Sequence, residues 1–321
     1  MDRPVRFLAL AAAFAALGNA SAASDVPAWA YVVNPPGASS LPEDGAPIHV
    51  PDSEATFSRA QLGDITGPVA DWHPDEHPAM PPIVGRGRPP QALACAYCHL
   101  PNGAGRPENA SLAGLTAAYI REQVKAFQNG ERPGLEPRRG PQTTMIAIAA
   151  ALTERETNEA ADYFAAVIPS SVVHVVEAAT VPRVTVAGWT LVRDPRGGRE
   201  LIGNRIVEMA VDFGRFENRD SRVRYVAFVP PGSIGRGAEL ASSGVHGRSV
   251  VCATCHGPGL KGLVDVPRLS GRSPSYLARQ LHDLRSGRRR GGTAELMKPV
   301  VANLTDEEIV DLCAYFASCD P

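Results

Sequence analysis

Two segments of the chain place two thiols and an imidazole within five residues. They read Cys95-Ala96-Tyr97-Cys98-His99 and Cys252-Ala253-Thr254-Cys255-His256. Two cysteines three residues apart can reach one face of a flat ligand, and the adjacent histidine then projects its ring at a central metal. In covalent c-type haem attachment each thiol adds to a haem vinyl group, and the histidine faces the iron. The two motifs therefore predict two covalently bound haem c groups.

Two other uses of paired cysteines fit the sequence less well. A zinc ribbon joins two Cys-x-x-Cys units about 15–20 residues apart, whereas these motifs lie 157 residues apart and each has its own histidine. A thioredoxin-like redox pair needs a βαβ context, which is missing here. Haem attachment is the interpretation that uses all the motif residues, which are Cys95, Cys98, His99, Cys252, Cys255 and His256.

The chain contains an internal duplication. The offset of 157 residues that relates the two motifs also relates Tyr119, Gln123 and Arg132 to Tyr276, Gln280 and Arg289. Further along, two methionines stand at an offset of 152, and each is followed by Leu-Thr seven residues later and by Tyr-Phe eighteen residues later. Such ordered correspondence indicates two copies of one unit. The loop before the second methionine is five residues shorter than the loop before the first.

Each copy is predicted to be helical. Apolar residues recur every three or four positions around 119–127 and around 276–284. A closing helix is predicted at 153–167 and at 305–318, because each begins with a threonine N-cap followed three residues later by a glutamate. The second copy should also have a first helix, over 233–242, ahead of its motif.

The combination of motif, later methionine and closing helix resembles the class I c-type cytochromes in their tandem two-haem form. The resemblance covers roughly 85–168 and 232–319. It implies a small helical fold around each haem, with histidine on one side of the iron and methionine on the other. By this resemblance the proximal ligands are His99 and His256, and the distal ligands are Met145 and Met297.

The choice of methionines also has a chemical basis. A thioether is a soft ligand that stabilises ferrous iron and raises the reduction potential. Of the five methionines, Met1 leaves with the export signal, Met209 lies in a β-rich segment, and only Met145 and Met297 occupy matching places in the duplication. Met80 is the spare candidate for the first haem.

The first copy departs from the family pattern. Prolines between Gly85 and Pro90 exclude a long helix before the first motif, so the N-terminal extension or the β-rich segment must cover the first haem. Upstream, the Pro-flanked His73 and His77 are interpreted as part of a structured surface segment. A metal site, or an approach of these histidines to the first haem, is the alternative.

The remaining segments complete the expected organisation. A basic start, an apolar stretch and Ala20-Ser21-Ala22 predict a cleavable signal peptide at 1–22. A Pro-rich extension follows at 23–80, with a short helix from Ser58 to Leu62. The expected fold is mainly α, with cytochrome c domains at 81–170 and 232–321. β-branched runs predict a small β-rich linker between them at 171–231, with strands at Val172–Val176, Val184–Val192, Ile206–Val211 and Tyr225–Val229.

Composition narrows the functional classes. The chain has 321 residues, with 34 acidic and 32 basic residues and a net charge of −2. This balance argues against a nucleic-acid-binding protein, and no apolar run reaches the roughly 20 residues of a membrane span. Arginines gather before each distal methionine, near Arg138 and near Arg288. They are interpreted as solvated, with two alternatives: docking of an acidic redox partner, or compensation of haem propionates.

These features predict a periplasmic diheme cytochrome that performs one-electron transfer, free or as the cytochrome subunit of a dehydrogenase or respiratory chain. An iron with both axial positions filled has no open site for substrate, so a carrier is favoured over an enzyme. The alternative is a diheme enzyme of thiosulfate-dehydrogenase or peroxidase type, with an open or unusual ligand at the first haem. A sensor or structural module is a third hypothesis.

Two cysteines remain outside the haem motifs. An oxidising compartment favours a disulfide between Cys313 and Cys319. Six residues of continuous helix separate α-carbons by about 9 Å, whereas a disulfide requires them within about 7 Å. The bond is therefore expected only if the helix ends near Ala317. The alternative is a buried thiol at Cys313 and a loose one at Cys319.

Overall fold

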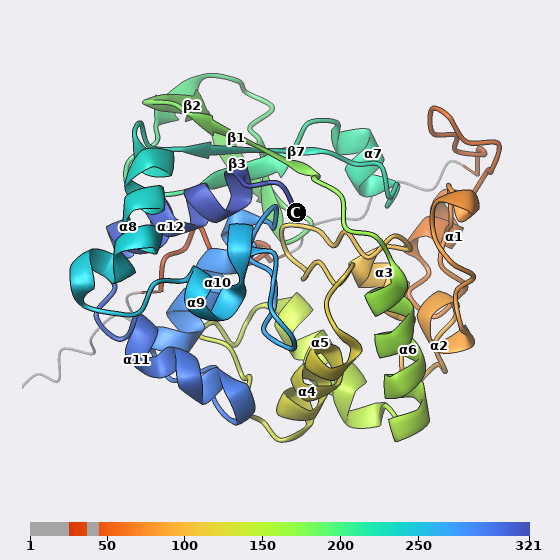
Figure 1. Ribbon diagram of the computed structural model, residues 1–321. Coiled ribbons are helices and arrows are strands. Elements are labelled where there is room, and N and C mark those ends of the chain that lie inside the picture. Colours follow the sequence, from red (N-terminus) through yellow and green to blue (C-terminus); the bar gives the residue numbers. More distant parts are fainter. Residues whose placement is uncertain (1–25, 37–44) are drawn as a thin grey trace, which may run out of the picture.

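The computed structural model describes residues 26–36 and 45–321. The predicted signal peptide at 1–22 lies outside these residues. Two groups of helices stand side by side beneath a layer of short strands (Figure 1). Within the described ranges, no helix is both long and apolar enough to cross a membrane.

The first helical group surrounds the first motif. It contains α3 (Cys95–His99), α4 (Ala117–Gln128), α5 (Gly140–Ala151) and α6 (Glu154–Ala166), with α4 packed against both α5 and α6. Helix α6 starts as predicted. The Thr153 hydroxyl accepts a hydrogen bond from the Glu156 backbone N–H, and the Glu156 carboxylate accepts one from the Thr153 N–H. This capping box satisfies two backbone donors that the helix itself leaves free.

The second helical group repeats this plan. It contains the helices α9 (Ala253–His256), α10 (Pro274–Arg285), α11 (Lys298–Val301) and α12 (Asp306–Ser318), and the short 3-10 helices η2 (Pro258–Leu260) and η3 (Gly292–Met297). The predicted first helix is present as α8 (Ser233–Gly247), which packs along α12. The two helices approach closely at Gly237, where a β-carbon would stand 2.0 Å from the Asp311 carbonyl oxygen.

Seven short strands lie between the two helical groups in sequence. They are β1 (Val173–Glu177), β2 (Thr180–Pro182), β3 (Val184–Ala187), β4 (Thr190–Arg193), β5 (Arg199–Leu201), β6 (Val207–Ala210) and β7 (Tyr225–Val229). The main sheet has the order β1-β7-β6, with β1 parallel and β6 antiparallel to β7. The predicted single run 184–192 is instead the hairpin β3–β4. Gly188 and Trp189 both take positive φ, at 59° and 65°, which turns the chain.

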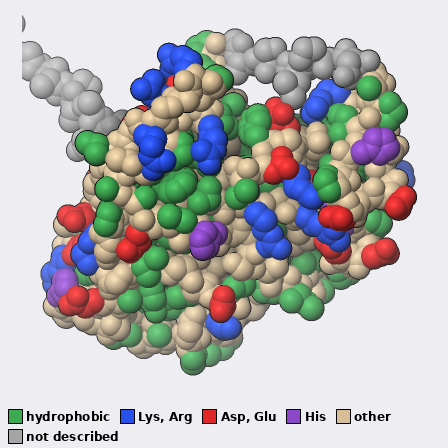
Figure 2. All heavy atoms as spheres, turned by 90° about the horizontal axis from the view of Figure 1, so that it is seen from above, with side chains coloured by type: hydrophobic (Ala, Val, Ile, Leu, Met, Phe, Trp, Pro, Cys, Tyr) green, Lys and Arg blue, Asp and Glu red, His purple; other side chains and the backbone are tan. Residues whose placement is uncertain are grey.

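The strands pack against the second helical group. Val173, Tyr225 and Val229 belong to the same buried core as Ile309 and Phe316 of α12. A helix of five residues, α7 (Phe213–Glu217), separates β6 from β7. Figure 2 views this face from above, and charged side chains of both signs lie there among apolar ones. The division of the chain at 170 and 231 stays a prediction.

The N-terminal extension packs on the first helical group. It contains α1 (Arg59–Gly63), η1 (Pro74–Glu76) and α2 (Pro82–Gly85), and α2 contacts α3 and α6. Ile83 and Val84 of α2 are buried in one core with Phe127 and Phe164. The short helix α1 agrees with the prediction. The extension therefore supplies apolar cover where the first group has no counterpart of α8.

The predicted disulfide is wrong. Helix α12 continues to Ser318, past the residue at which it would have to end. The Cys313 thiol is fully buried, and the Cys319 thiol donates a hydrogen bond to the Tyr315 carbonyl at 3.3 Å. Both thiols are free, because a continuous helix holds positions six residues apart out of bonding reach.

Candidate functional site

Beside each Cys-x-x-Cys-His motif lies a separate cavity, which is called a hollow below. The first is lined by Cys95, Cys98, His99 and Met145, and encloses about 1220 Å³ of space that is partly open to solvent. The second is lined by Cys252, Cys255, His256 and Met297, and its space of about 1620 Å³ is likewise partly open to solvent. The walls of both hollows are mainly apolar. Space of this size beside two thiols and an imidazole suits a large, flat, apolar ligand.

The two histidines are oriented in the same way. The Nδ1–H of His99 donates to the Ala110 carbonyl at 2.8 Å, and that of His256 donates to the Pro267 carbonyl at 2.7 Å. A carbonyl oxygen can only accept, so Nδ1 carries the proton and Nε2 keeps a free lone pair. Burial lowers the pKa of both rings. The arrangement produces two neutral imidazoles, each ready to bind a metal through Nε2.

Three of the four motif thiols, those of Cys95, Cys98 and Cys252, have a raised pKa and are neutral at physiological pH. Burial, followed by the neighbouring Cys98, raises the pKa of Cys95 to about 12, and burial raises that of Cys98. Burial also raises the pKa of Cys252 to about 11. Reactive or metal-binding thiols need a lowered pKa. The environment therefore disfavours thiolate chemistry, and it agrees with thiols that serve as attachment points.

The methionines that match in the duplication both reach a hollow. Met145 lies on α5 and lines the first hollow, whereas Met297 ends η3 and lines the second. Met80 does not line the first hollow and instead packs beside Gly85 of α2. The structure thus brings Met145 rather than Met80 to the side of His99. Axial ligation by these methionines stays a prediction.

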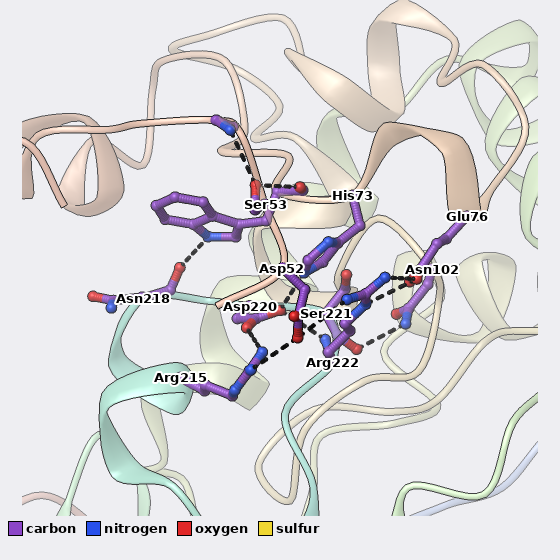
Figure 3. Close-up of polar contacts among 12 residues, drawn as sticks. Asp52, Ser53, His73, Glu76, Asn102, Arg215, Asn218, Asp220, Ser221 and Arg222 are labelled. Carbon is purple, nitrogen blue, oxygen red and sulfur yellow. Dashed lines mark hydrogen bonds and ion pairs between the residues drawn. The ribbon is translucent and has the colours of Figure 1, made fainter. Parts of the chain in front are cut away.

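The two upstream histidines are held by aspartates, and Figure 3 shows the first of them, His73, beside Asp220. His73 is buried and lies 3.0 Å from the Asp220 carboxylate, which also pairs with Arg215. His77 lies 3.2 Å from Asp71. Neither histidine lines a hollow, and the described residues contain no group of three or more His, Cys, Asp or Glu side chains placed to hold a metal ion. Both rings therefore fasten the N-terminal extension in place, as the structured-segment interpretation expected.

A symmetric polar network lies between the two hollows. Arg132 donates to Gln123 at 3.0 Å and to Gln280 at 2.8 Å. Arg289 donates to the same two side chains, at 2.9 Å and 3.1 Å. Arg289 also donates to the Tyr119 hydroxyl at 3.0 Å. Each arginine therefore bridges both copies of the duplicated unit.

The tyrosine and glutamine members of this network were not predicted as functional, and their equal offset of 157 residues served only as evidence of duplication. Arg132 and Arg289 were considered only as members of the two arginine clusters, with docking or propionate compensation as alternatives to a solvated role. The signal available in the sequence was that three polar residues, Tyr119, Gln123 and Arg132, recur at one offset. Side chains related by a pseudo-two-fold axis meet where that axis passes, so recurring polar residues can bond to one another across it.

The surroundings of the hollows carry an excess of buried positive charge. Burial, with Arg279 nearby, lowers the pKa of Arg139 to about 9, and burial with Arg272 nearby lowers that of Arg268 to about 9. Around the hollows, the Nε atoms of Arg139, Arg268, Arg272 and Arg289 find no hydrogen-bond partner among the described residues. Their other guanidinium nitrogens bond to neutral oxygen atoms, and buried cations without anionic partners are costly. Ligands that bring several carboxylates, such as two haems with their propionates, fit this environment.

The two arginine-rich loops do not form uniform charged surfaces. Arg132 and Arg139 are buried, whereas Arg138 is exposed and pairs with Glu136 at 2.7 Å. In the second loop Arg288 is exposed, and Arg289 points into the network described above. The propionate alternative therefore suits the inner arginines of each loop. Arg138 and Arg288 are exposed, so the solvated and partner-docking interpretations apply to them.

An N-terminal segment seals the junction between the two copies. The Tyr31 hydroxyl donates to the Asp283 carboxylate at 2.8 Å, and Arg279 donates to the Ala30 carbonyl at 2.9 Å. Asp283 also accepts from the Leu135 backbone N–H, at 3.0 Å, in the loop before Met145. Tyr31 is almost fully buried. This segment therefore joins α10 of the second group to the first group.

Comparisons with known proteins agree with the site. The family model for cytochrome c matches residues 236–320. Cytochrome c-554(548) of Halomonas halodenitrificans is 43% identical over 68 residues, which cover 21% of this chain and 82% of that protein. A "thiosulfate dehydrogenase electron acceptor" of Stutzerimonas stutzeri is 27% identical over 238 residues, which cover 72% of this chain and 82% of that protein. Cytochrome c4 of Thiocapsa roseopersicina is 42% identical over 69 residues, or 21% of this chain and 34% of that protein.

Proposed function

The chain belongs to the c-type cytochromes that carry two haems in tandem, and on this premise we propose that it is a periplasmic carrier that exchanges single electrons with redox proteins. The observation that carries the proposal is the pair of matching sites, each with two thiols, a neutral imidazole and a thioether around one hollow. When bound, haem c supplies an iron that alternates between the ferric and ferrous states.

The protein residues would hold each iron and set its potential. We propose His99 and Met145 as axial ligands at the first site, and His256 and Met297 at the second. The hydrogen bonds from Nδ1 to Ala110 and Pro267 fix each ring and increase its basicity. The thioethers favour the ferrous state and so raise the potential. With both axial positions filled, neither iron would have room for a substrate.

The network between the hollows would couple the two sites. The guanidinium groups of Arg132 and Arg289 contact both copies, and the first hollow is also lined by Arg272 and Arg279 from the second copy. We propose that these cations neutralise haem carboxylates from both units. Buried positive charge would also favour the reduced state of each iron. The arrangement supports electron exchange within the molecule as well as with partners.

The sequence relatives suggest the kind of electron donor. The proteins of Stutzerimonas stutzeri and Thiomonas intermedia that match over more than 70% of this chain are described as thiosulfate dehydrogenase electron acceptors. We propose that a dehydrogenase acting on reduced sulfur compounds supplies the electrons. The chain would then be the acceptor rather than the enzyme. Met145 lines the first hollow together with His99, and as an axial ligand it would leave no position on that iron for a substrate.

Localisation and domain division belong to the same proposal. The basic start, apolar stretch and Ala20-Ser21-Ala22 support export by a cleavable signal peptide at 1–22. We propose two cytochrome domains at 81–170 and 232–321, with the β-rich segment 171–231 between them. Redox partners would dock near exposed arginines of the two loops, of which Arg288 is the better candidate because Arg138 is already paired.

Carbon monoxide distinguishes the carrier from a haem enzyme. The holoprotein is reduced with dithionite, and its absorption spectrum is recorded before and after exposure to the gas. A carrier with two filled irons should show no change in the Soret band at neutral pH. A change that corresponds to half of the haem would reveal an open iron and contradict the proposal. Reduction by thiosulfate in the absence of any second protein would also contradict it.

A further inference from the structure

A glycine precedes each of the two matching methionines by five residues. Gly140 is the first residue of α5, and Gly292 is the first residue of η3. The offset of 152 residues that relates Met145 to Met297 also relates these two glycines. At both positions a side chain from outside the copy lies so close that a β-carbon would collide with it. The glycines therefore mark two places where another part of the chain holds a methionine-bearing segment.

At the second site the close neighbour is Glu122, which belongs to α4 of the first copy. Its Oε1 atom occupies the space that a β-carbon on Gly292 would need. The carboxylate accepts hydrogen bonds from the Thr293 backbone N–H at 2.7 Å and from the Thr293 hydroxyl at 2.8 Å. The N–H groups in the first turn of a helix have no partner within that helix. Glu122 therefore caps η3, the segment that ends at Met297, from the other copy.

The loop before η3 is bound to the same part of the first copy. The Arg290 backbone N–H donates to the Glu131 carbonyl at 3.0 Å, and the Arg290 guanidinium donates to the Gly130 carbonyl at 3.0 Å. Both acceptors lie in the turn that follows α4. The chain that leads to Met297 is therefore anchored on the first copy at its start.

The same cap cannot form at the first site. The offset of 157 residues places Arg279 at the position of Glu122, and the offset of 152 residues places Pro141 at that of Thr293. A guanidinium has no lone pair to offer, and proline has no backbone N–H to donate. Arg279 instead donates to the Ala30 carbonyl at 2.9 Å. The cap at the second site thus has no counterpart at the first.

At the first site the close neighbour is Trp189 of the β-rich segment. A β-carbon on Gly140 would stand 2.5–3.0 Å from three atoms of the six-membered ring of this tryptophan. Trp189 lies in the turn between β3 and β4, where its φ of 65° is rare for a residue other than glycine. Its backbone N–H donates to the Asn34 side-chain oxygen at 2.8 Å. These contacts hold the ring on the first turn of α5, the helix that carries Met145.

We propose that Trp189 and Glu122 are positioning residues, each of which holds one axial methionine at its iron from outside the copy that contains that methionine. Trp189 acts on Met145 by packing on the start of α5. Glu122 acts on Met297 through the cap of η3, so a helix of the first copy stabilises ligation at the second site. Close packing and capping restrict the backbone from which each methionine projects. The inference rests on the axial ligands proposed above.

Displacement by cyanide measures how firmly each methionine is held. This anion binds to a six-coordinate ferric haem only after an axial ligand has left the iron. The oxidised holoprotein is prepared with carbon-13 in the methionine methyl groups and is mixed with excess cyanide. Nuclear magnetic resonance then gives the rate at which each iron-bound methyl signal disappears. Met145→Leu and Met297→Leu, which each remove one signal, assign the two resonances.

Glu122→Ala should accelerate the loss of Met297 about fivefold, because a helix cap of ordinary strength changes a local equilibrium by about that factor. The rate for Met145 should stay the same. A role confined to the packing of α4 would have the opposite effect, because that helix lines the first hollow. Glu122→Gln keeps an acceptor oxygen and should restore most of the wild-type rate. The matched control is Glu159→Ala, which removes a carboxylate paired with Arg155 on α6 and should change neither rate.

Trp189→Ala should accelerate the loss of Met145 by roughly tenfold or more, because the start of α5 loses a large packing partner. The rate for Met297 should stay the same. Gly140→Ala provides a second measurement, since its β-carbon would meet the ring. Alone it should also accelerate the loss of Met145, whereas in the Trp189→Ala background it should add nothing. Such coupling is expected of a direct contact and not of a general loss of stability.

Each positioning residue is judged at its own site. Equal acceleration at both methionines would show a general loss of stability and overturn the inference for that residue. Unchanged rates in Glu122→Ala or in Trp189→Ala would show that the segment holds its methionine unaided. A wild-type protein in which neither methyl signal responds to cyanide would instead contradict the proposed axial ligands themselves.

Discussion

Replacing Gly237 with alanine should loosen the second haem site specifically. The added β-carbon would stand 2.0 Å from the Asp311 carbonyl oxygen and 2.8 Å from the Tyr315 β-carbon. Because these are atoms of the backbone and its first side-chain carbon, they cannot rotate away. Helices α8 and α12 must therefore move apart by roughly 1 Å, which weakens dispersion contacts along their interface. Overpacking of this kind costs about 1–3 kcal/mol.

The matched control lies half a turn away on the same helix. Gly235 is exposed, and an added β-carbon there meets nothing within 4 Å. Gly235→Ala should therefore stabilise the protein by about 0.5–1 kcal/mol, since alanine restricts the unfolded chain and favours the helix. The two alanine variants differ only in position, and their effects should have opposite signs.

Urea unfolding of the holoproteins provides the assay. Far-UV circular dichroism reports the helices, and the Soret band reports the haem environment. We expect a lower midpoint for Gly237→Ala and a higher one for Gly235→Ala. Leu312 and Phe316 of α12 line the second hollow. In Gly237→Ala, the half of the Soret change that comes from the second haem should therefore occur at a lower urea concentration than the other half. Equal midpoints for the two variants would refute the close helix contact from which the argument starts.

Two further predictions concern the distal methionine of the second site and the ion pair at the start of α6. Met297→Ala should allow carbon monoxide to bind to half of the reduced haem. It should also lower the reduction potential of that centre, because the iron loses a soft ligand. Met80→Ala is the control and should leave the absorption spectrum and the potential unchanged. Glu156→Gln should lower the urea midpoint at pH 7 by the equivalent of about 1 kcal/mol or less, since Arg88 is 42% exposed and water screens the pair. The Arg88 hydrogen bond lowers the pKa of Glu156 from 4.5 to about 2. The wild-type advantage should therefore be present above about pH 4.5 and disappear as the pH falls towards 2. An advantage that is constant over this range would contradict it.

The sequence predicted features that depend on local spacing. The capping boxes at Thr153 and Thr305 formed as expected, because their partners lie three residues away on the same helix. Met145 and Met297 were selected because they occupy matching positions in the two copies, and both line a hollow. The capping boxes could be predicted from residues within one helix, and the methionines from the constant spacing between the two copies.

The sequence could not predict contacts between distant segments. Arg219 covers Tyr97 across 122 residues, and Tyr31 reaches Asp283 across 252. No periodicity or motif relates such positions, because their meeting depends on how the β-rich segment and the N-terminal extension pack. The Cys313–Cys319 pairing failed for a different reason. Spacing gave the distance along an ideal helix, but not the residue at which that helix ends.

Counting the electrons that one molecule accepts tests the central claim most directly. The oxidised holoprotein is reduced by coulometry, and the haem absorption is followed at each potential. The account predicts two electrons per chain, taken up in one-electron steps, with all of the absorption change complete at the second electron. Uptake of a single electron per chain, or an absorption change that saturates at one, would contradict the presence of two redox-active sites.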